Sequence, residues 1–495
     1  MRERERLERT VAAIAQDDYA SRHAIAGWMY AARFDARFLD AELVPQALRQ
    51  RSPAPPARLG TGDARTLAPD AASHLARVAG IGEVVQLHAA LEELVALCAW
   101  THDDGVGTAG GGGVGGGRSF CHDATLNVVV IGAGPIGLAL ASAIRVALGP
   151  SADILVVENR VASPGRKRAY ERRWLTAVGH DCLTTIVEPS VRDLVARIGT
   201  ASHIGVTIDV LETLLYLSCV RMGVRFLFDE RPDLSFVGER PVHLVFDATG
   251  NRLQVDEADA SVAVGPPIAL DSSNVRAGRF ASYGVDVTAP TSGAIHIATA
   301  GGVRYPLVDG RRLVQAMVKI TQVPARLCDA LVDLVRRDNH DNKHYVWRGS
   351  LREEINHGLV LVNLARAEYE ALWAAHVYPL GLAAALASPA LRAALDARTI
   401  ELLVRIADCT TQDELARVEI DAPFVWRPYW NTSRNATLHG APLVRIGDSI
   451  YNGNVKLANG LGPHLRHVAH VQQHLWQHAT SRHAERIARS IALPR

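Results

Sequence analysis

The stretch LNVVVIGAGPIGLALASAIR, from Leu126 to Arg145, decides the fold of this chain. Its length and apolar content are those of a marginal membrane span. Its centre, however, holds Gly132, Gly134, Pro135 and Gly137, and Asn127 and Arg145 lie near its ends. Most of its first six residues are β-branched, whereas the second half is rich in Ala and Leu. The pattern therefore predicts a strand that turns at the glycines into a helix.

The three glycines form a GxGxxG motif between the expected strand and helix. In such a motif the first glycine permits the tight turn, the second lets a pyrophosphate approach the backbone, and the third lets helix and strand pack closely. The start of the helix then offers free N–H groups to the phosphates. The candidate cofactor-binding residues of this segment are Gly132, Gly134, Pro135, Ile136 and Gly137.

A second strand, DILVVE, completes a βαβ unit and ends at Glu158. At this position a carboxylate accepts hydrogen bonds from ribose hydroxyls; the alternative is a solvated strand end. Asn159, Arg160 and Arg166 follow as candidate contacts to the phosphates or to adenine.

The far end of the chain distinguishes between dinucleotides. VRIGDSIYNGNVKLANGLG, residues 444–462, places Gly447 and Asp448 after an apolar strand. A carboxylate there can bond the ribityl chain of a flavin, and the glycine-led helix start at Gly460, Leu461 and Gly462 lets the backbone approach the flavin ring. The paired motifs favour FAD.

With these motifs the sequence resembles the class A FAD-dependent monooxygenases of the para-hydroxybenzoate hydroxylase type, over roughly residues 125–260 and 440–475. Asp247, Thr249 and Gly250 in FDATGNR resemble the strand-end segment of these flavoproteins. The resemblance implies that NAD(P)H docks transiently to reduce FAD. Dioxygen then oxygenates a small organic or amino-acid-like substrate through a flavin hydroperoxide.

Weaker features resemble the MICAL group: GAGPIGLALA, the ENR segment at Glu158, and VTIDVLE followed after ten residues by GV. Two departures stand against them. The tryptophan-and-proline run of that group is absent after GD, and Ile208 lies where an arginine often opens the helix in class A enzymes.

Two alternatives remain open. One is an FAD-dependent dehydrogenase or cyclase without oxygen transfer, and the other is a flavin-bound redox sensor or binding protein. No second GxGxxG follows a later strand, and the halogenase motif WxWxIP is absent from the sequence.

The predicted fold class is α/β: a Rossmann-like FAD-binding domain with an inserted mixed α+β substrate domain and an N-terminal helical extension. The expected substrate domain has antiparallel strands from about residue 279 to 321, and helices dominate from about 324 to 416. The expected regions are an N-terminal helical region (1–104), a Gly-rich linker (105–124), the first part of the FAD-binding domain (125–260), the substrate domain (261–439), and the second part of the FAD-binding domain with a C-terminal helix (440–495).

Aromatic and basic residues cluster in HDNKHYVWR (340–348) and FVWRPYW (424–430). The second cluster precedes the GD motif, so it is expected to border the flavin, although aromatic residues are also common in strand packing. The candidate substrate-pocket residues are Trp426, Tyr429, Trp430, Asn454 and Lys456. The sequence singles out no catalytic residue, which fits a cofactor that carries the chemistry.

Composition limits the remaining possibilities. The 495 residues suggest two or three domains, and a net charge of +1 without a basic stripe argues against a nucleic-acid partner. The six cysteines are scattered without a CxxC pair, so we expect no metal site and a reducing, cytoplasmic location. No membrane span is expected, and the oligomeric state stays open.

Overall fold

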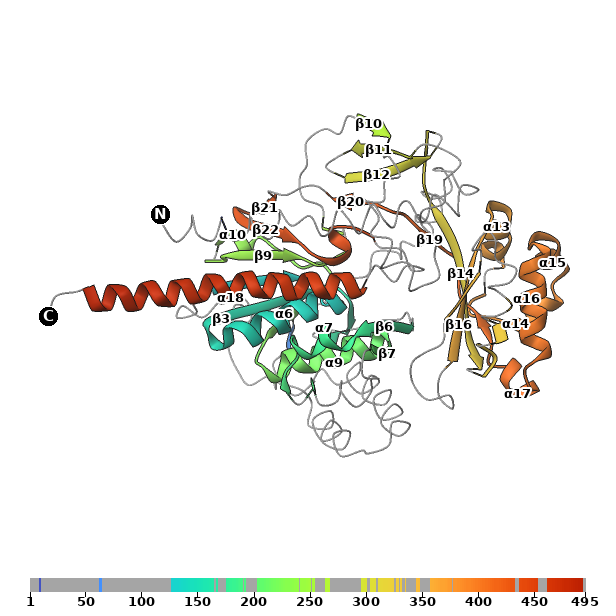
Figure 1. Ribbon diagram of the computed structural model, residues 1–495, viewed down its shortest axis with the longest axis horizontal. Coiled ribbons are helices and arrows are strands. Elements are labelled where there is room, and N and C mark those ends of the chain that lie inside the picture. The colour runs from blue at the N-terminus through green and yellow to red at the C-terminus, as the bar shows by residue number, and fades with distance from the viewer. Residues whose placement is uncertain are drawn as a thin grey trace.

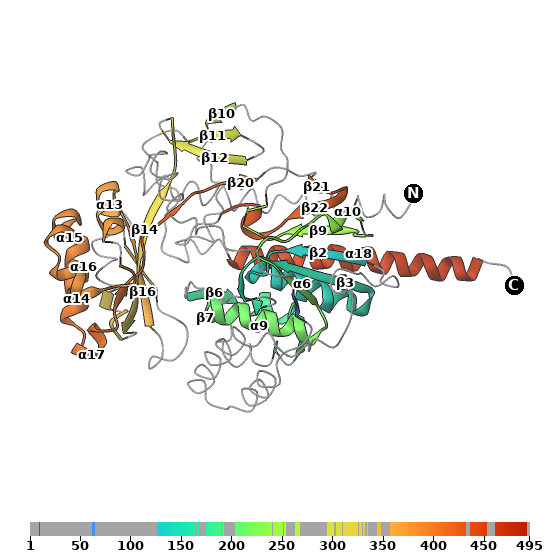
Figure 2. The same cartoon turned by 180° about the vertical axis from the view of Figure 1, so that it is seen from behind.

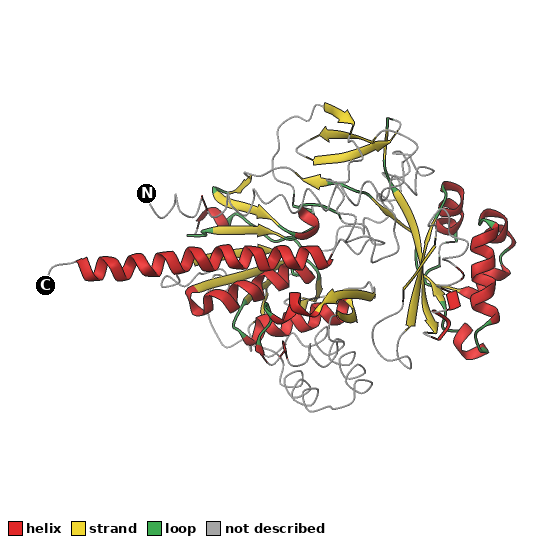
Figure 3. Ribbon diagram, in the orientation of Figure 1, coloured by secondary structure: helices red, strands yellow, loops and turns green. Residues whose placement is uncertain are grey.

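A computed structural model gives the arrangement of the chain (Figure 3). It describes Arg9 and residues 62–64, 126–163, 166–167, 175–189, 191–192, 203–239, 241–250, 252–253, 263–267, 295–300, 303–308, 310–324, 326–328, 330–331, 334, 344–347, 357–375, 377–431, 436–452 and 461–492. Three parts of the predictions lie outside this set. They are the Gly-rich linker (105–124), residues 281–288 of the expected antiparallel strands, and all other residues of the N-terminal helical region (1–104).

A seven-stranded sheet forms the centre of the molecule, in the order β1-β8-β3-β2-β9-β22-β21. The five inner strands are parallel, and the two edge strands are antiparallel to their neighbours. The strands are β1 (Gly62–Ala64), β2 (Leu126–Ile131), β3 (Ala152–Glu158), β8 (Arg225–Phe228), β9 (Leu244–Asp247), β21 (Ala436–Leu438) and β22 (Ala441–Arg445).

Three long helices cover one face of this sheet (Figure 1): α6 (Pro135–Leu148), α9 (Ile208–Arg221) and α18 (Leu461–Ala492). β3 and β8 follow β2 on one side, whereas β9 and β22 lie on the other side of β2. The strand order thus reverses at β2, and ligands of open α/β sheets bind at such a reversal, outside the carboxyl ends of the strands. The Rossmann-like prediction is confirmed.

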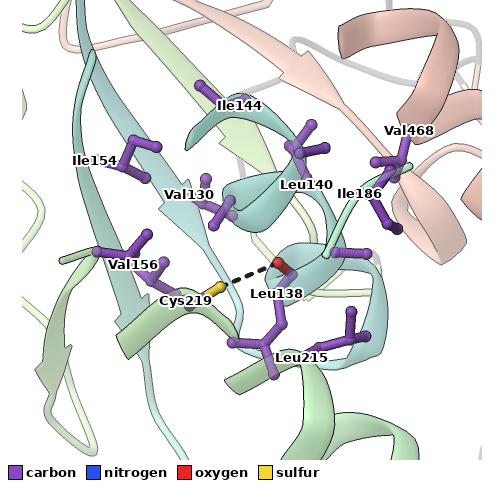
Figure 4. Close-up of a cluster of buried hydrophobic side chains, with 14 of the residues drawn as sticks. Val130, Leu138, Leu140, Ile144, Ile154, Val156, Ile186, Leu215, Cys219 and Val468 are labelled. Carbon is purple, nitrogen blue, oxygen red and sulfur yellow. Dashed lines mark hydrogen bonds between the residues drawn. The ribbon is translucent and has the colours of Figure 1, made fainter. Parts of the chain in front are cut away.

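The buried strands pack on both faces because successive side chains point to opposite sides of a sheet. Val128 and Val130 face α6 and α9, while Val129 and Ile131 face the opposite layer around the short helix α10 (Phe236–Glu239). Figure 4 shows the helix side, where the Cys219 thiol donates to the backbone oxygen of Leu138 (3.3 Å). The apolar run at the start of β2 is therefore a strand covered on both sides.

Two further sheets lie beside the central one, and the C-terminal end of α18 points away from them (Figures 1 and 2). One sheet contains β10 (Ala263–Pro267), β11 (Ile295–Ala300), β12 (Val303–Val308), β13 (Arg311–Arg312) and β20 (Trp430–Asn431). The other contains β14 (Gln315–Pro324), β15 (His344–Trp347), β16 (His357–Asn363), β17 (Leu380–Gly381), β18 (Glu419–Ile420) and β19 (Phe424–Trp426).

Helices cover the sheet built on β14 and enclose a second core. They are α13 (Arg366–Ala374), α14 (Leu382–Ala387), α15 (Pro389–Ala394), α16 (Ala397–Asp408) and α17 (Gln412–Leu415). Smaller elements near the central sheet are β4 (Val161–Ser163) with β5 (Arg166–Lys167), β6 (Leu175–Gly179) with β7 (His203–Thr207), and the helix α7 (His180–Thr184).

Two strand regions lie where mainly helices were expected. Helices dominate the described residues from about 324 to 416, as predicted, but β15 and β16 lie among them, with β16 paired to β14. The apolar run of β16 is short, and such a run does not by itself distinguish a buried strand from a helix. Within the N-terminal region, residues 62–64 form an edge strand on β8 rather than helix.

The opening stretch is a strand followed by a helix, as predicted. Among the described residues, no helix is long and apolar enough to cross a membrane.

Candidate functional site

The loop between β2 and α6 contains two glycines that the chain itself requires. Gly132 has φ +104°, and a Cβ there would lie 2.7 Å from the backbone oxygen of Ala248. A Cβ on Gly137 would lie 1.9 Å from the backbone oxygen of Gly132. Neither position can hold a larger residue without moving backbone, so these glycines fix the tight turn and its approach to the loop after β9.

Gly134 differs from both, because a Cβ built on it meets no atom within 4 Å. Its backbone is extended (φ −72°, ψ 178°), a conformation open to any residue, and it forms the N-cap of α6. No side chain caps the helix, and Pro135 occupies its first turn. The protein therefore leaves open space at a helix N-terminus, where the backbone N–H groups and the helix dipole favour an anion.

Glu158, at the end of β3, holds the loop between β2 and α6 through hydrogen bonds. Its carboxylate accepts hydrogen bonds from the backbone N–H of Ala133 (2.7 Å) and of Arg160 (2.8 Å), and it pairs with the Arg160 guanidinium (3.1 Å). Burial opposes ionisation of Glu158, but the Arg160 charge and these hydrogen bonds outweigh it and hold the pKa of the carboxyl below its usual value. Glu158 is therefore ionised and held against the turn, with one lone pair, on Oε1, left for a ribose hydroxyl.

Arg160 is itself anchored by a residue that the sequence did not indicate. Its guanidinium pairs with Glu212 of α9 at 2.6 Å and donates to the backbone oxygen of Ala133 at 3.0 Å. Glu212 is buried in an otherwise apolar stretch of α9. A charged residue on the buried face of a helix was the available signal, since such residues are almost always paired.

Asp247, at the end of β9, joins the loops of two strands. One of its carboxylate oxygens accepts hydrogen bonds from the backbone N–H of Thr249 (3.0 Å), the hydroxyl of Thr249 (2.7 Å) and the hydroxyl of Ser449 (2.9 Å). The Ser449 oxygen in turn accepts from the backbone N–H of Gly250 (2.9 Å). Asp247 is fully buried, so it links the DATG and GD loops instead of facing a ligand.

The GD loop after β22 packs on the first loop. Gly447 has φ +63°, and a Cβ there would lie 2.9 Å from Cγ2 of Ile136. The next residue, Asp448, is 59% exposed, although one of its oxygens lies 3.1 Å from Nε2 of His464 on α18. The His464 ring is buried against Tyr451, with ring centroids 4.3 Å apart. Among the described carboxylates of the loops after β2, β9 and β22, Asp448 is thus the exposed one. His464, which the sequence did not indicate, contacts it and orients it.

Tyr429 lies against the same loop. Its phenol donates to the backbone oxygen of Asp448, and its own backbone oxygen accepts from the N–H of Asn452 (3.1 Å). Burial raises the pKa of the Tyr429 phenol, and the charges of Asp448 and Asp247 raise it further, so the phenol stays protonated as a donor.

The other aromatic candidates pack within the neighbouring sheets. Trp430 lies under the guanidinium of Arg304 (5.0 Å to the ring centroid), and Trp426 is buried in β19.

The structure brings together the loops after β2, β9 and β22 at one edge of the sheet, and α18 begins beside them with Leu461 and Gly462. Asn159 is exposed next to Glu158. Gly460, Asn454 and Lys456 lie outside the described residues, and Arg166 is described only as part of the backbone of β5. Among the described residues, no group of three or more His, Cys, Asp or Glu side chains could hold a metal ion.

No protein-family model matches the sequence, and no curated protein matches it. The structure is similar to the myxobacterial chondrochloren halogenase, a variant of FAD-dependent halogenases (13% identity, 74% of this chain, 76% of that chain, TM-score 0.34). It is also similar to 2-methyl-3-hydroxypyridine-5-carboxylic acid oxygenase (11% identity, 72% and 86% covered, TM-score 0.38). A third similar structure is a flavoprotein/dehydrogenase from Cytophaga hutchinsonii (10% identity, 71% and 78% covered, TM-score 0.33). Likenesses this distant carry no argument about the reaction, which must come from the site itself.

Proposed function

We propose that this protein is an FAD-dependent oxidoreductase that acts as a monooxygenase on a small molecule, with NAD(P)H as electron donor. One observation carries the FAD assignment: open space at Gly134 and an exposed carboxylate at Asp448 lie on loops joined at the same sheet edge. The first suits a pyrophosphate and the second a hydroxylated chain, and a dinucleotide flavin carries both groups.

The described residues fit the parts of FAD in order along the sheet edge. The pyrophosphate would be held by the dipole of α6 and by the backbone N–H groups of Gly134, Ile136 and Gly137. Pro135, between them, has no N–H and begins the helix. Glu158 would accept from the ribose, with Asn159, Arg160 and Arg166 nearby. Asp448 would accept from the ribityl hydroxyls, while Leu461 and Gly462 at the start of α18, together with Gly460, would approach the ring.

When bound, FAD would supply the redox and oxygen chemistry. This chain's own residues would bind it and keep its surroundings rigid. The Asp247–Ser449 hydrogen bond fixes the spacing between the DATG and GD loops, and the His464–Asp448 contact orients the ribityl-facing carboxylate. The Tyr429 phenol donates to the GD loop from the side of the neighbouring sheet. On this side a substrate would be positioned and water excluded.

The described cysteines are Cys182, Cys219, Cys328 and Cys409, and all four are unbridged. This state fits the cytoplasm, where thiols stay reduced, and we propose that location.

The purified protein tests the proposal directly. We expect it to carry, or to take up from solution, one FAD per chain with the absorbance of oxidised flavin, and to consume oxygen when NADPH or NADH is added with a substrate. Asp448→Ala should weaken FAD binding, whereas the matched variant Asp413→Ala, on the exposed helix α17, should not. A chain that cannot be reconstituted with FAD refutes the cofactor assignment. Reduction of bound flavin without oxygen transfer to any substrate would instead favour the dehydrogenase.

A further inference from the structure

Buried polar atoms without hydrogen-bond partners gather where β13, β14 and β19 meet. Within the described part of the chain they include Nε of Arg312, Oε1 of Gln315 and Nε1 of Trp426. Gln315 and Trp426 are direct partners in the β14–β19 register, so their side chains leave the same face of the sheet. Buried polar atoms are nearly always satisfied in proteins. The two unsatisfied donors, Nε of Arg312 and Nε1 of Trp426, indicate that something else supplies an acceptor, whereas Oε1 of Gln315 is itself an acceptor.

Arg312 is the first cation of this group. It pairs with Leu307 across β12 and β13, and its guanidinium lies over the ring of Tyr305, 4.3 Å from the centroid. Burial lowers the pKa of Arg312, although the nearby Tyr305 opposes the shift. Its neighbour Arg311 is exposed, as alternation along a strand predicts.

Arg427, the residue after Trp426, is the second cation. It is half-buried, and burial together with the nearby Arg312 charge lowers its pKa to about 10. Both guanidiniums are charged at neutral pH, because arginine stays protonated in proteins. Among the described residues, no carboxylate forms an ion pair with either of them. Two desolvated like charges disfavour each other, and an anion between them removes that cost.

The backbone of Arg427 lies beside the proposed flavin site. The backbone oxygen of Arg427 accepts a hydrogen bond from the side chain of Asn452 (2.9 Å), four residues beyond Asp448. Two residues along the chain from Arg427, Tyr429 contacts Asp448 itself. The hydrogen bond from Asn452 places the backbone of Arg427 next to the chain that follows the GD loop.

We propose that Arg312 and Arg427 bind the anionic oxygens of the substrate, so that the substrate is an organic acid bearing a carboxylate or a phosphate ester. The statement that the anion is a substrate rests on the proposed function. The statement that an anion binds here rests only on the two arginines. The planar fork of a guanidinium matches both anions with paired hydrogen bonds.

Calorimetric titration of the purified protein with benzoate and with phenyl phosphate tests the site without turnover. We expect at least one of the two to bind, and Arg312→Met and Arg427→Met each to raise its Kd about tenfold or more, the loss expected for one hydrogen bond to a charged group. Arg427→Lys should recover part of the affinity, because it restores the charge without the fork. Arg311→Met, on the same strand, should bind as the parent does.

Thermal unfolding shows that each variant is folded, and the flavin absorbance shows whether the proposed cofactor is bound. The inference is overturned if neither anion binds, or if both bind equally well to the parent and to the two methionine variants. It is also overturned if the arginines affect only NADPH, and neither NADH nor the organic anions, because the anion is then the 2′-phosphate of the donor. Anion binding that depends on both arginines in a protein unable to hold FAD would uphold the site and refute the proposed function.

Discussion

Gly134→Ala should separate cofactor binding from folding, because Gly134 alone of the three motif glycines faces open space. A Cβ at Gly134 meets nothing within 4 Å, whereas a Cβ at Gly137 would lie 1.9 Å from a backbone oxygen. We therefore expect Gly134→Ala to fold normally and to lose FAD affinity. Gly137→Ala is the matched variant in the same motif, and it should lose stability whether or not FAD is present.

The expected stability changes follow from the geometry. At Gly134 the extended backbone accepts Ala, which stabilises by about 0.4–1 kcal/mol through the unfolded chain. Ala is a poorer N-cap than Gly, which costs a similar amount, so the net change should stay within about 1 kcal/mol. At Gly137 the added methyl must displace backbone, and overpacking of this kind costs about 1–3 kcal/mol or more.

The expected loss of FAD affinity follows from the space that the methyl fills. A methyl group at Gly134 would hold the pyrophosphate away from the N–H groups at the start of α6. A hydrogen bond to a charged group is worth about 1.5–3 kcal/mol, so Kd for FAD should rise about 10- to 150-fold.

Urea unfolding of the FAD-free variants measures the first quantity, and titration of FAD followed by its fluorescence measures the second. The reasoning fails if Gly134→Ala destabilises the FAD-free chain as much as Gly137→Ala does, because the glycine would then be needed for packing. It also fails if Gly134→Ala binds FAD as tightly as the parent.

Other substitutions test the rest of the site. Gly447→Ala should lower the free energy of unfolding by about 1–3 kcal/mol, because φ is +63° and the Cβ would lie 2.9 Å from Ile136. Adding Ile136→Ala removes that contact and not the backbone strain, so it should restore only part of the lost stability. Urea unfolding measures both changes. The depressed pKa of Glu158 contributes stability that is present above its unfolded pKa and is lost as pH falls through the lower folded pKa; Glu158→Gln should therefore flatten the acid limb of the Tm-versus-pH curve, and an unchanged limb would contradict this. His464→Leu should raise Kd for FAD about tenfold by releasing Asp448, and an unchanged Kd would show that the contact does not orient the carboxylate.

Local patterns in the sequence were enough to predict the strand–turn–helix at residues 126–145, the second strand ending at Glu158, and the strand before Gly447. Glycine spacing and hydrophobic periodicity act within short windows, so they are readable without knowing the rest of the fold. Where the same signal was ambiguous, it did not single out every strand. The apolar residues of β16 form too short a run to reveal a strand, and pairing with β14 decided its conformation.

Only the tertiary structure assigned partners to the polar side chains. Asp247 and Ser449 are 202 residues apart, yet they hydrogen-bond because β9 and β22 are neighbours in the sheet. Glu212 reaches Arg160, and Arg427 comes beside Arg312, for the same kind of reason. The sequence by itself determined which segments become strands and helices and which motifs could hold a dinucleotide. The structure decided which charges are paired and which face open space, because strand order and packing bring together side chains that no local pattern relates.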